Sequence, residues 1–308
     1  QQRQHLVAGL LRFCARLGIA HHVIDVEAAF SRFVVNRFVA SYRGGRTPNP
    51  CVACNELVKF PALVRAADRF GCGAIATGHY ARIVADRRGS PLLAAAADAA
   101  KDQSYFLYRI PVGILRRTLF PLGGLSKKSA KALAERYGYD VAGVRESQDV
   151  CFVPDGDLRR FLAERIGDRP GDVVDADGRT LGRHEGVHTV TIGQRKGLGI
   201  AGGEPLYVAG IDAARKRIVL APKERSYHAG ARCGSLRLRT RVLDGQLEAK
   251  VRYRRPPAPV REARITGRHL DVSFAEPQWA VTPGQSLVLY RGGVLIGGGV
   301  IEEGIATR

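Results

Sequence analysis

Two cysteines in a short proline-braced segment are the residues of this sequence best suited to chemistry. Cys51 and Cys54 stand in a C-x-x-C spacing, directly after two prolines in the segment 47–50. Proline fixes its own φ and disfavours helix for the residue before it, so this loop is expected to be extended. The sequence predicts that Asn55 caps a helix running to about Phe70. A thiol at such a helix start is favoured as thiolate, which makes Cys54 a candidate nucleophile.

The same spacing has two other interpretations. Half of a zinc site would need a second close pair of ligands, and the remaining cysteines are isolated, so that only Cys72 and His79 are placed to complete one. A thioredoxin-like dithiol normally belongs to a small dedicated βαβ domain, and paired prolines before the cysteines fit that motif poorly. We favour the nucleophile and expect no metal site.

The charge of the chain is its most unusual bulk property. Forty-eight Lys plus Arg against 29 Asp plus Glu give a formal net charge of +19. Such a balance favours a polyanionic partner, and nucleic acid is the leading one. A basic, arginine-rich proteome is the alternative explanation, because many surfaces then become positive without a nucleic-acid partner.

Length and cysteine usage indicate the broad class of protein. The 308 residues are enough for two or three domains with a sizeable core. No apolar run approaches the roughly 18 residues of a membrane span, and no secretory signal opens the chain. Six scattered cysteines favour reduced thiols and a cytoplasmic location without a membrane. Because the chain begins at Gln1 and contains no methionine, we expect the gene product to start further upstream.

Hydrophobic periodicity predicts the elements that must position the cysteines. A helix is expected over residues 1–17, a strand over 21–26, a second helix over 27–42 and a strand over 72–78. This order is typical of an open parallel α/β sheet, in which ligands bind beyond the carboxyl ends of the strands. Gly78 and His79 follow such a strand end and are therefore site candidates; a plain turn and a surface histidine are the alternatives.

Further polar segments precede the predicted domain boundary. A hairpin is expected over 81–97, followed by Lys101, Asp102 and Gln103, three polar residues suited to a sugar–phosphate backbone. Helices are expected over 127–137 and 157–166. Between them a polar segment runs into Cys151, which its neighbours favour as a reactive thiol, although an isolated cysteine is commonly buried filler.

The second half of the chain reads as β structure. Residues 167–171 are expected to form a domain boundary, and 175–178 a hairpin turn. The loop 191–199 is interpreted as a basic turn near RNA or at an interdomain surface, with a solvated hairpin as the alternative. From about residue 232 six short strands predict a small barrel. Its second strand is expected to alternate cations with apolar residues over 250–255. One face of that strand would then be positive, with Tyr253 available to stack on a base.

At this point the sequence resembles the bacterial tRNA-specific 2-thiouridylases, the MnmA family, over nearly its whole length. Seven motifs in the family order carry the resemblance: Gly45-Arg-Thr-Pro-Asn-Pro-Cys-Val-Ala-Cys-Asn55, Ala76-Thr-Gly-His-Tyr80, Lys101-Asp-Gln-Ser-Tyr105, Ser147-Gln-Asp-Val-Cys-Phe152, Thr191-Ile-Gly-Gln-Arg195, Val251-Arg-Tyr-Arg254 and Thr282-Pro-Gly-Gln285.

The resemblance implies an α/β fold in three parts. It predicts an adenine-nucleotide alpha-hydrolase-like (PP-loop) parallel-sheet catalytic domain over 1–166 that lacks its first elements. A small β-rich central domain is expected over 167–228, and a C-terminal, tRNA-binding β-barrel over 229–308.

It also implies an activity: ATP-dependent 2-thiolation of the wobble uridine of tRNA, with Mg²⁺ accompanying ATP and no tightly bound cofactor. Cys151 would carry the sulfur as a persulfide, and Cys54 would be the nucleophile, leaving a disulfide between the two. A cysteine desulfurase or sulfur relay protein would donate the sulfur.

The remaining roles carry over by position. Gly78 would contact ATP. The residues that would contact tRNA or its target base are Asn49, Pro50, Cys51, His79, Lys101, Asp102, Gln103, Arg252, Tyr253 and Gln285. Some family members have aspartate at the position of Cys51, so a role that needs that carboxylate is not carried over.

One family motif is absent from this sequence. The family's pyrophosphate loop, Ser-Gly-Gly-x-Asp-Ser, does not occur in the chain, whose first residue aligns with a helix that follows it. Two hypotheses therefore stand. The chain is a sulfur transferase whose N-terminal part is missing from this sequence, or it is a non-catalytic tRNA-binding fragment that has lost ATP chemistry. An in-frame Ser-Gly-Gly-x-Asp-Ser upstream of Gln1 would distinguish them.

Overall fold

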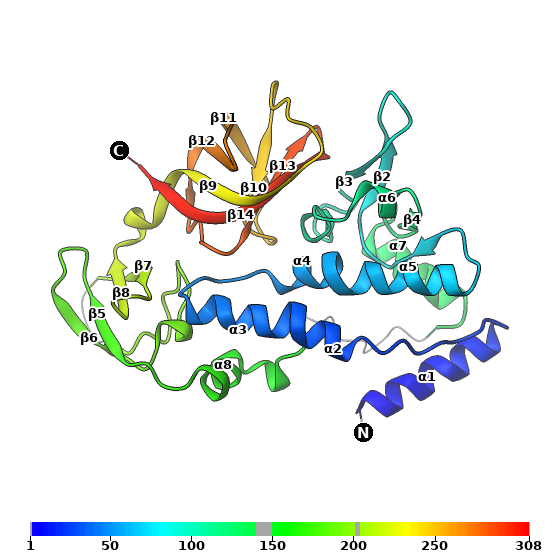
Figure 1. Cartoon of the computed structure of the whole chain (residues 1–308), viewed down its shortest axis with the longest axis horizontal. Coiled ribbons are helices and arrows are strands. Elements are labelled where there is room, and N and C mark those ends of the chain that lie inside the picture. Colours follow the sequence, from blue (N-terminus) through cyan, green and yellow to red (C-terminus); the bar gives the residue numbers. More distant parts are fainter. Residues whose placement is uncertain (1, 140–149, 201–203, 308) are drawn as a thin grey trace.

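The computed structural model of the chain describes residues 2–139, 150–200 and 204–307, and Figure 1 shows its arrangement. Two long helices lie side by side across the middle of the molecule. The barrel of β9 to β14 lies against one side of them, the β5 to β8 sheet lies near one end, and α1 lies near the other. Residues 140–149, which include Ser147, Gln148 and Asp149 of the motif before Cys151, lie outside the described part.

The two long helices are each interrupted by one π turn. They comprise α2 (Glu27–Phe30), η1 (Ser31–Val35) and α3 (Asn36–Arg43), and then α4 (Pro50–Cys54), η2 (Asn55–Lys59) and α5 (Phe60–Arg69). A short loop connects them, and α4 contacts η1 while α2 contacts η2, so they form an antiparallel hairpin. This hairpin carries the cysteine motif at its turn.

The other helices are short or peripheral. They are α1 (Gln2–Arg16), η3 (Ser104–Phe106), α6 (Val112–Leu115), α7 (Lys127–Arg136), η4 (Pro154–Gly156), α8 (Leu158–Ile166), η5 (Val187–Thr189) and η6 (Lys223–Ser226). Two of them begin at a capping side chain, of which the one at Ser126 is predicted from the sequence and confirmed. Ser126 accepts the backbone N–H of Ser129 at the start of α7, and Asp157 accepts that of Arg160 at the start of α8.

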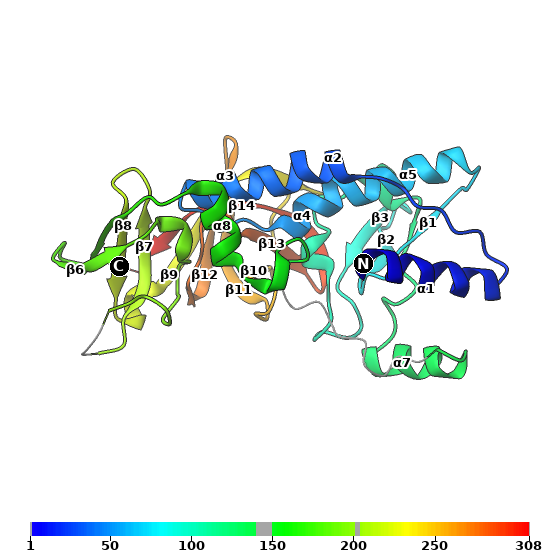
Figure 2. The ribbon, with the colours of Figure 1, turned by 90° about the horizontal axis from the view of Figure 1, so that it is seen from below.

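A small parallel sheet occupies the N-terminal domain. It pairs β1 (Ile75–Ala76) with β4 (Thr118–Leu119), and Figure 2 shows α5 and α7 on opposite sides of this region. The strand expected over 72–78 is therefore only two residues long. The strand expected over 21–26 is wrong: this segment has no ladder partner among the described residues, and Val23 is 69% exposed. An apolar run becomes a strand only where a neighbour accepts its backbone hydrogen bonds.

The C-terminal half forms a closed barrel. Its strands are β9 (Tyr227–Leu238), β10 (Glu248–Lys250), β11 (Ala258–Thr266), β12 (His269–Trp279), β13 (Ser286–Arg291) and β14 (Val294–Ala306). The order β13-β10-β11-β12-β9-β14 closes through the β13–β14 pairing. Val272, Leu287 and Ile301 are fully or almost fully buried inside it. The barrel expected from the sequence is confirmed.

Two further sheets connect to this frame. The predicted hairpin of β2 (Arg82–Ala85) and β3 (Pro91–Ala94) extends the barrel sheet, because Ala94 pairs with Val294 of β14. The central sheet has the order β6-β5-β8-β7, built from β5 (Gly171–Val174), β6 (Thr180–His184), β7 (Tyr207–Asp212) and β8 (Arg217–Ala221). The hairpin predicted at 175–178 joins β5 to β6.

One barrel strand is shorter than the sequence pattern predicts. β10 ends at Lys250, and the chain then turns over residues 251–254. Ala249 and Val251 pack in the barrel core, whereas Lys250 is buried at the junction with Asp102 and is not on an exposed face. The expected strand over 250–255 with one exposed basic face is therefore wrong.

A buried ion pair joins the barrel to the N-terminal domain. The Lys250 Nζ lies 3.7 Å from the Asp102 carboxylate, and both side chains are 7% exposed. Asp102 also accepts the backbone N–H groups of Ala96 and Ser104 and the Ser104 hydroxyl, at 3.0 to 3.1 Å. Ser104 Oγ in turn hydrogen-bonds Tyr290 Oη of β13 at 3.0 Å. Burial lowers the pKa of Lys250, and the Asp102 carboxylate opposes that effect.

We predict that Asp102→Asn lowers the free energy of unfolding by about 3–5 kcal/mol, because it leaves a buried ammonium without its counter-charge. The double variant Asp102→Asn with Lys250→Met should lose less than Asp102→Asn alone. Urea unfolding of the three chains measures this. A double variant less stable than Asp102→Asn would show that Lys250 stabilises the junction without the carboxylate.

Candidate functional site

The helix that carries the cysteines begins earlier than the sequence indicates. It starts at Pro50, and its cap is Asn49, whose side-chain oxygen accepts the Val52 N–H at 3.4 Å. Asn55 is buried inside the helix, where its Nδ2 donates to the Phe106 carbonyl at 3.3 Å. The predicted cap at Asn55 is thus wrong, because a preceding Asn-Pro pair supplies both a side-chain acceptor and a proline suited to the first turn.

Three thiols from two distant segments interact electrostatically at this helix start. A negative charge on Cys151 raises the pKa of both Cys51 and Cys54, which places the three sulfurs within electrostatic reach of one another. Cys51 and Cys151 are exposed, and Cys54 is partly buried. All six cysteines are free in this structure, so the expected disulfide between Cys54 and Cys151 is not present.

The environment of these thiols differs from the thiolate-favouring one expected. Burial raises the pKa of Cys54, and the positive charge of Lys59 opposes that effect. Burial, with the charges of the other two thiols, raises the pKa of Cys51 to about 11. Cys54 lies at the end of α4 rather than ahead of the helix, so it is less exposed to the unpaired N–H groups of the helix start than expected.

The strand end at Gly78 and His79 is linked to the thiols through the charge of Lys59, which acts on both. His79 Nδ1 hydrogen-bonds Thr77 Oγ1 at 2.8 Å, and its ring packs beside Phe60 and Phe120, with centroids 5.8 and 6.1 Å away. Burial and the charge of Lys59 lower the pKa of His79 to about 4. The imidazole is therefore neutral at neutral pH.

Gly78 is exposed and has room beside it. A Cβ at this position would meet only Leu122 Cδ1, at 3.8 Å. The backbone at the carboxyl end of β1 is thus accessible to a flat ligand, in the position where open α/β sheets bind theirs.

A turn of the barrel holds the loop that precedes the cysteines. Gln285 Nε2 donates to the carbonyls of Thr47 and Pro48 at 3.0 and 3.1 Å, and the Thr47 N–H donates to the Pro283 carbonyl at 2.9 Å. Gly284 has φ +94°, and a Cβ there would lie 2.9 Å from the Thr47 carbonyl oxygen. The amide nitrogen of Gln285 therefore makes contacts within the protein and not the predicted contact with tRNA.

Asp102 and Gln103, from the polar segment 101–103, are held by contacts within the protein. Asp102 is buried in the ion pair described above, and Gln103 Oε1 accepts the Tyr80 N–H at 2.9 Å. Gln103 therefore fixes the residue that follows His79. Lys101 lines a cleft of about 1030 Å³ between the N-terminal domain and the barrel, which Arg254 and Arg255 also line.

Arg252 and Tyr253 support the domain junction. Arg252 Nη2 donates to the Ile192 carbonyl at 2.9 Å and to Thr282 Oγ1 at 2.7 Å. The Tyr253 ring packs on Phe106, with centroids 4.4 Å apart. Ile192 belongs to the loop 191–199, which accordingly lies at an interdomain contact.

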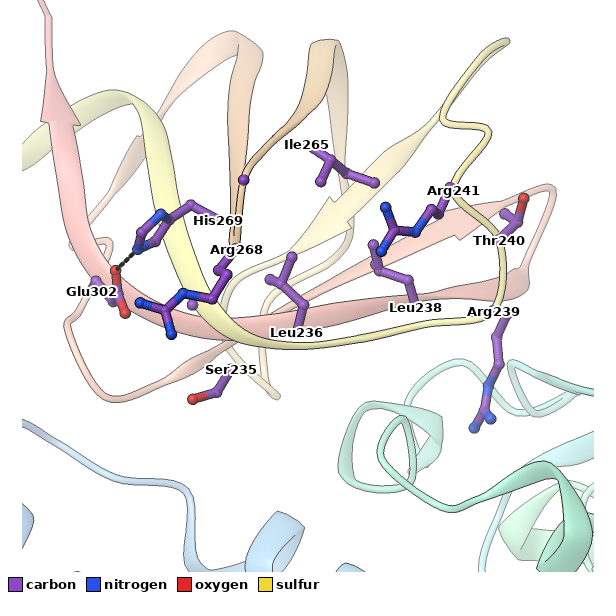
Figure 3. A pocket seen from close by; sticks show the side chains of 12 residues that line it. Ser235, Leu236, Leu238, Arg239, Thr240, Arg241, Ile265, Arg268, His269 and Glu302 are labelled. Carbon is purple, nitrogen blue, oxygen red and sulfur yellow. Dashed lines mark ion pairs between the residues drawn. The ribbon is translucent and has the colours of Figure 1, made fainter.

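A second basic hollow lies on the barrel, shown in Figure 3. It has a volume of about 750 Å³, and Arg241, Arg268 and His269 line it. His269 Nε2 pairs with Glu302 Oε2 at 3.3 Å, and the Arg239 side chain leaves the hollow to donate to the Tyr108 carbonyl at 3.2 Å. No cysteine lines this hollow, so it is not a candidate reaction centre.

The described residues offer neither a metal site nor a membrane-spanning helix. Among the described residues no group of three or more His, Cys, Asp and Glu side chains is arranged to hold a metal ion, which gives no support to the zinc interpretation. Within the same part of the chain, no helix has the length and apolar character needed to cross a membrane.

Comparison with known proteins identifies the family. Residues 4–155 match the family model described as tRNA methyl transferase HUP domain, 159–222 the tRNA methyl transferase PRC-barrel domain, and 236–301 the aminomethyltransferase beta-barrel domain. A tRNA-specific 2-thiouridylase MnmA of Geotalea uraniireducens is 44% identical over 96% of this chain and 80% of its own length. The chain belongs to the MnmA family. Proteins of the same name from Acidithiobacillus ferrooxidans and a Synechococcus strain are 43% and 45% identical, each over 94% of this chain and over 84% and 80% of their own lengths.

Sequence reasoning missed two residues of this MnmA-family site. Lys59 acts on two thiols and on His79, and Thr77 holds the His79 ring. Thr77 lies within a recognised motif, so its position carried a signal. Lys59 stands five residues after Cys54, a spacing that places two residues on one helix face only when the helix contains a π turn.

We predict that Gly284→Ala destabilises the chain by roughly 2–4 kcal/mol, since it adds a clash with Thr47 to the strain of a positive φ. Gly71→Ala is the matched control: its φ is +68°, and a Cβ there would meet no atom within 4 Å. That variant should lose only about 1 kcal/mol. Thermal unfolding of both chains provides the comparison, and equal losses would mean that the Thr47 contact does not constrain the loop.

Proposed function

We propose that this chain catalyses the ATP-dependent 2-thiolation of a uridine at the wobble position of tRNA. The observation that supports this most strongly is the electrostatic interaction of Cys51, Cys54 and Cys151, together with a Lys59 charge that also acts on His79. Sulfur transfer needs one thiol to carry sulfur and a second thiol within reach of it. The names of the relatives, which cover nearly the whole chain, favour the same reaction over a non-catalytic fragment.

The proposed reaction replaces the C2 oxygen of uracil by sulfur. That oxygen is a poor leaving group, and ATP, with Mg²⁺, would supply the adenylyl group that makes it a good one. The open backbone beside Gly78 fits an adenine ring, and this is the only ATP contact that we assign.

The protein's own groups divide the remaining work. Cys151, exposed at the surface, would receive sulfur from a cysteine desulfurase or sulfur relay protein as a persulfide. Its terminal sulfur would form the bond to C2 as the activated oxygen leaves with AMP. The Cys54 thiolate would then attack the Cys151 sulfur and break the sulfur–sulfur bond, so that the transferred sulfur stays on C2 and a disulfide between Cys54 and Cys151 is left for an external thiol to reduce. Asn49, Pro50 and Cys51 would flank the extruded base. The neutral His79 ring would contact the tRNA by hydrogen bonding, without adding charge.

The tRNA would follow the basic cleft between the N-terminal domain and the barrel. Lys101, Arg254 and Arg255 line that cleft, and the formal charge of the chain is +19. We propose contacts to phosphate from these three residues, while Asp102, Gln103, Arg252 and Gln285 shape the interface through their internal bonds. The hollow of Figure 3 extends the basic surface over the barrel.

We further propose the division into a catalytic domain over 1–166, a central domain over 167–228 and a tRNA-binding barrel over 229–308. The buried pair of Asp102 and Lys250 would then cross the boundary between catalysis and RNA binding. We place the reaction in the cytoplasm.

In the active enzyme, Cys54→Ser and Cys151→Ser should each abolish thiolation, because a hydroxyl neither carries sulfur nor attacks it at neutral pH. Thiolated tRNA is measured by its retardation in a mercury-containing gel. Cys14→Ser and Cys72→Ser are the controls, since neither thiol is among the three that interact at the site. A Cys151→Ser enzyme that still thiolates tRNA would contradict the assignment.

The double variant Arg254→Ala with Arg255→Ala should weaken tRNA binding and reduce the slope of log K against log salt by roughly two units. The reason is that binding releases about one counterion for each phosphate contact, and two contacts are lost. Filter binding over a salt series measures the slope. Arg215→Ala, at an exposed turn of the central domain with a side chain 75% exposed, is the control and should leave the slope unchanged. An unaltered slope in the double variant would remove these two arginines from the RNA interface.

A further inference from the structure

The helix that carries Cys54 contains a π turn directly after it. The Phe60 N–H donates to the Asn55 carbonyl, five residues back, where an α-helix would bond four residues back. In an uninterrupted α-helix the residue one turn after Cys54 would be Val58, which here is buried at 2% exposure. The wider turn places Lys59 in that position instead, and Lys59 is exposed.

The Lys59 ammonium acts on groups from two elements. Burial raises the pKa of Cys54 and Cys51, and the Lys59 charge opposes that effect on its own helix; burial lowers the pKa of His79, which follows β1, and the Lys59 charge adds to that effect. Lys59 is therefore within electrostatic reach of both the helix thiols and the strand end. Among the described residues, Cys151, which precedes η4, also acts on these thiols.

Among the described residues, no carboxylate forms an ion pair with this lysine. None of the ion pairs formed by described residues includes Lys59. The acidic residue of the same turn, Glu56, is paired with Arg109 at 2.5 Å and with Arg237 at 3.3 Å. A cation beside a thiol favours the thiolate, and an uncompensated one does so most.

We propose that Lys59 is the electrostatic positioning residue of the thiol site: brought over Cys54 by the π turn, its ammonium stabilises the Cys54 thiolate and thereby sets the reactivity of that sulfur. The catalytic meaning of this inference rests on the proposed function, in which Cys54 is the nucleophile. The ionisation itself is a property of the chain alone and is measurable without tRNA or ATP.

The test is the rate of iodoacetamide alkylation of Cys54 across a pH series, followed by peptide mass spectrometry on the full chain. Lys59→Met should slow alkylation at pH 8 by roughly three- to ten-fold and move the profile to higher pH, because less thiolate is present. Lys59→Arg keeps the charge and should stay within about two-fold of the parent chain. Lys223→Met, in η6, is the control and should leave the rate unchanged.

Two further measurements separate a local electrostatic effect from unfolding of the chain. Cys233 is fully buried in the barrel, so its alkylation in any variant reports unfolding rather than a local effect. On the unaltered chain, high salt should slow Cys54 alkylation at pH 8, because ions screen an exposed lysine. A Lys59→Met profile that superimposes on the parent, or a rate on the unaltered chain that ignores salt, would overturn the proposal. A shifted profile in a chain that does not thiolate tRNA would instead reject only the proposed function.

Discussion

The geometry of the thiol site depends on a few hydrogen bonds between a barrel turn and the loop before the cysteines. Gln285 donates to two successive carbonyls, of Thr47 and Pro48, and the Thr47 N–H donates back to Pro283. Pro48 and Pro50 leave this loop with few backbone donors of its own, so an outside donor is needed to satisfy its carbonyls. With the loop held, Asn49 caps the helix, and the helix orients Cys51 and Cys54.

This dependence changes the meaning of several family motifs. Asp102, Gln103, Arg252 and Gln285 all belong to motifs that favoured RNA contact, yet each makes bonds within the protein. A motif identifies residues that a function needs, and it does not separate those that contact the ligand from those that hold the contacting parts together. Burial separates them: Asp102 is 6% exposed, whereas Arg254 and Arg255 are exposed at the cleft.

Signals that act over a few residues were reliable in the sequence. The Ser126 cap of α7, the two hairpins and the existence of the barrel follow from local turn and periodicity rules, and the structure confirms them. The failures arose where a distant partner decides the outcome. Residues 21–26 lack a strand partner among the described residues, and β10 stops where Lys250 turns to a carboxylate that lies far away in the sequence. The three cysteines could be named in advance, but the charge that Lys59 places among them required knowledge of the π turn.

The position of the barrel turn in the chain has a consequence for biosynthesis. Gln285 leaves the ribosome 238 residues after Thr47, whose carbonyl it binds. Domains generally fold as they emerge, so the cysteine loop stays without this support, with its thiols accessible, while the central domain and most of the barrel are synthesised. During that interval the thiols are open to oxidation. A message truncated after β12 would yield a protein with every cysteine intact and no means of aligning the site.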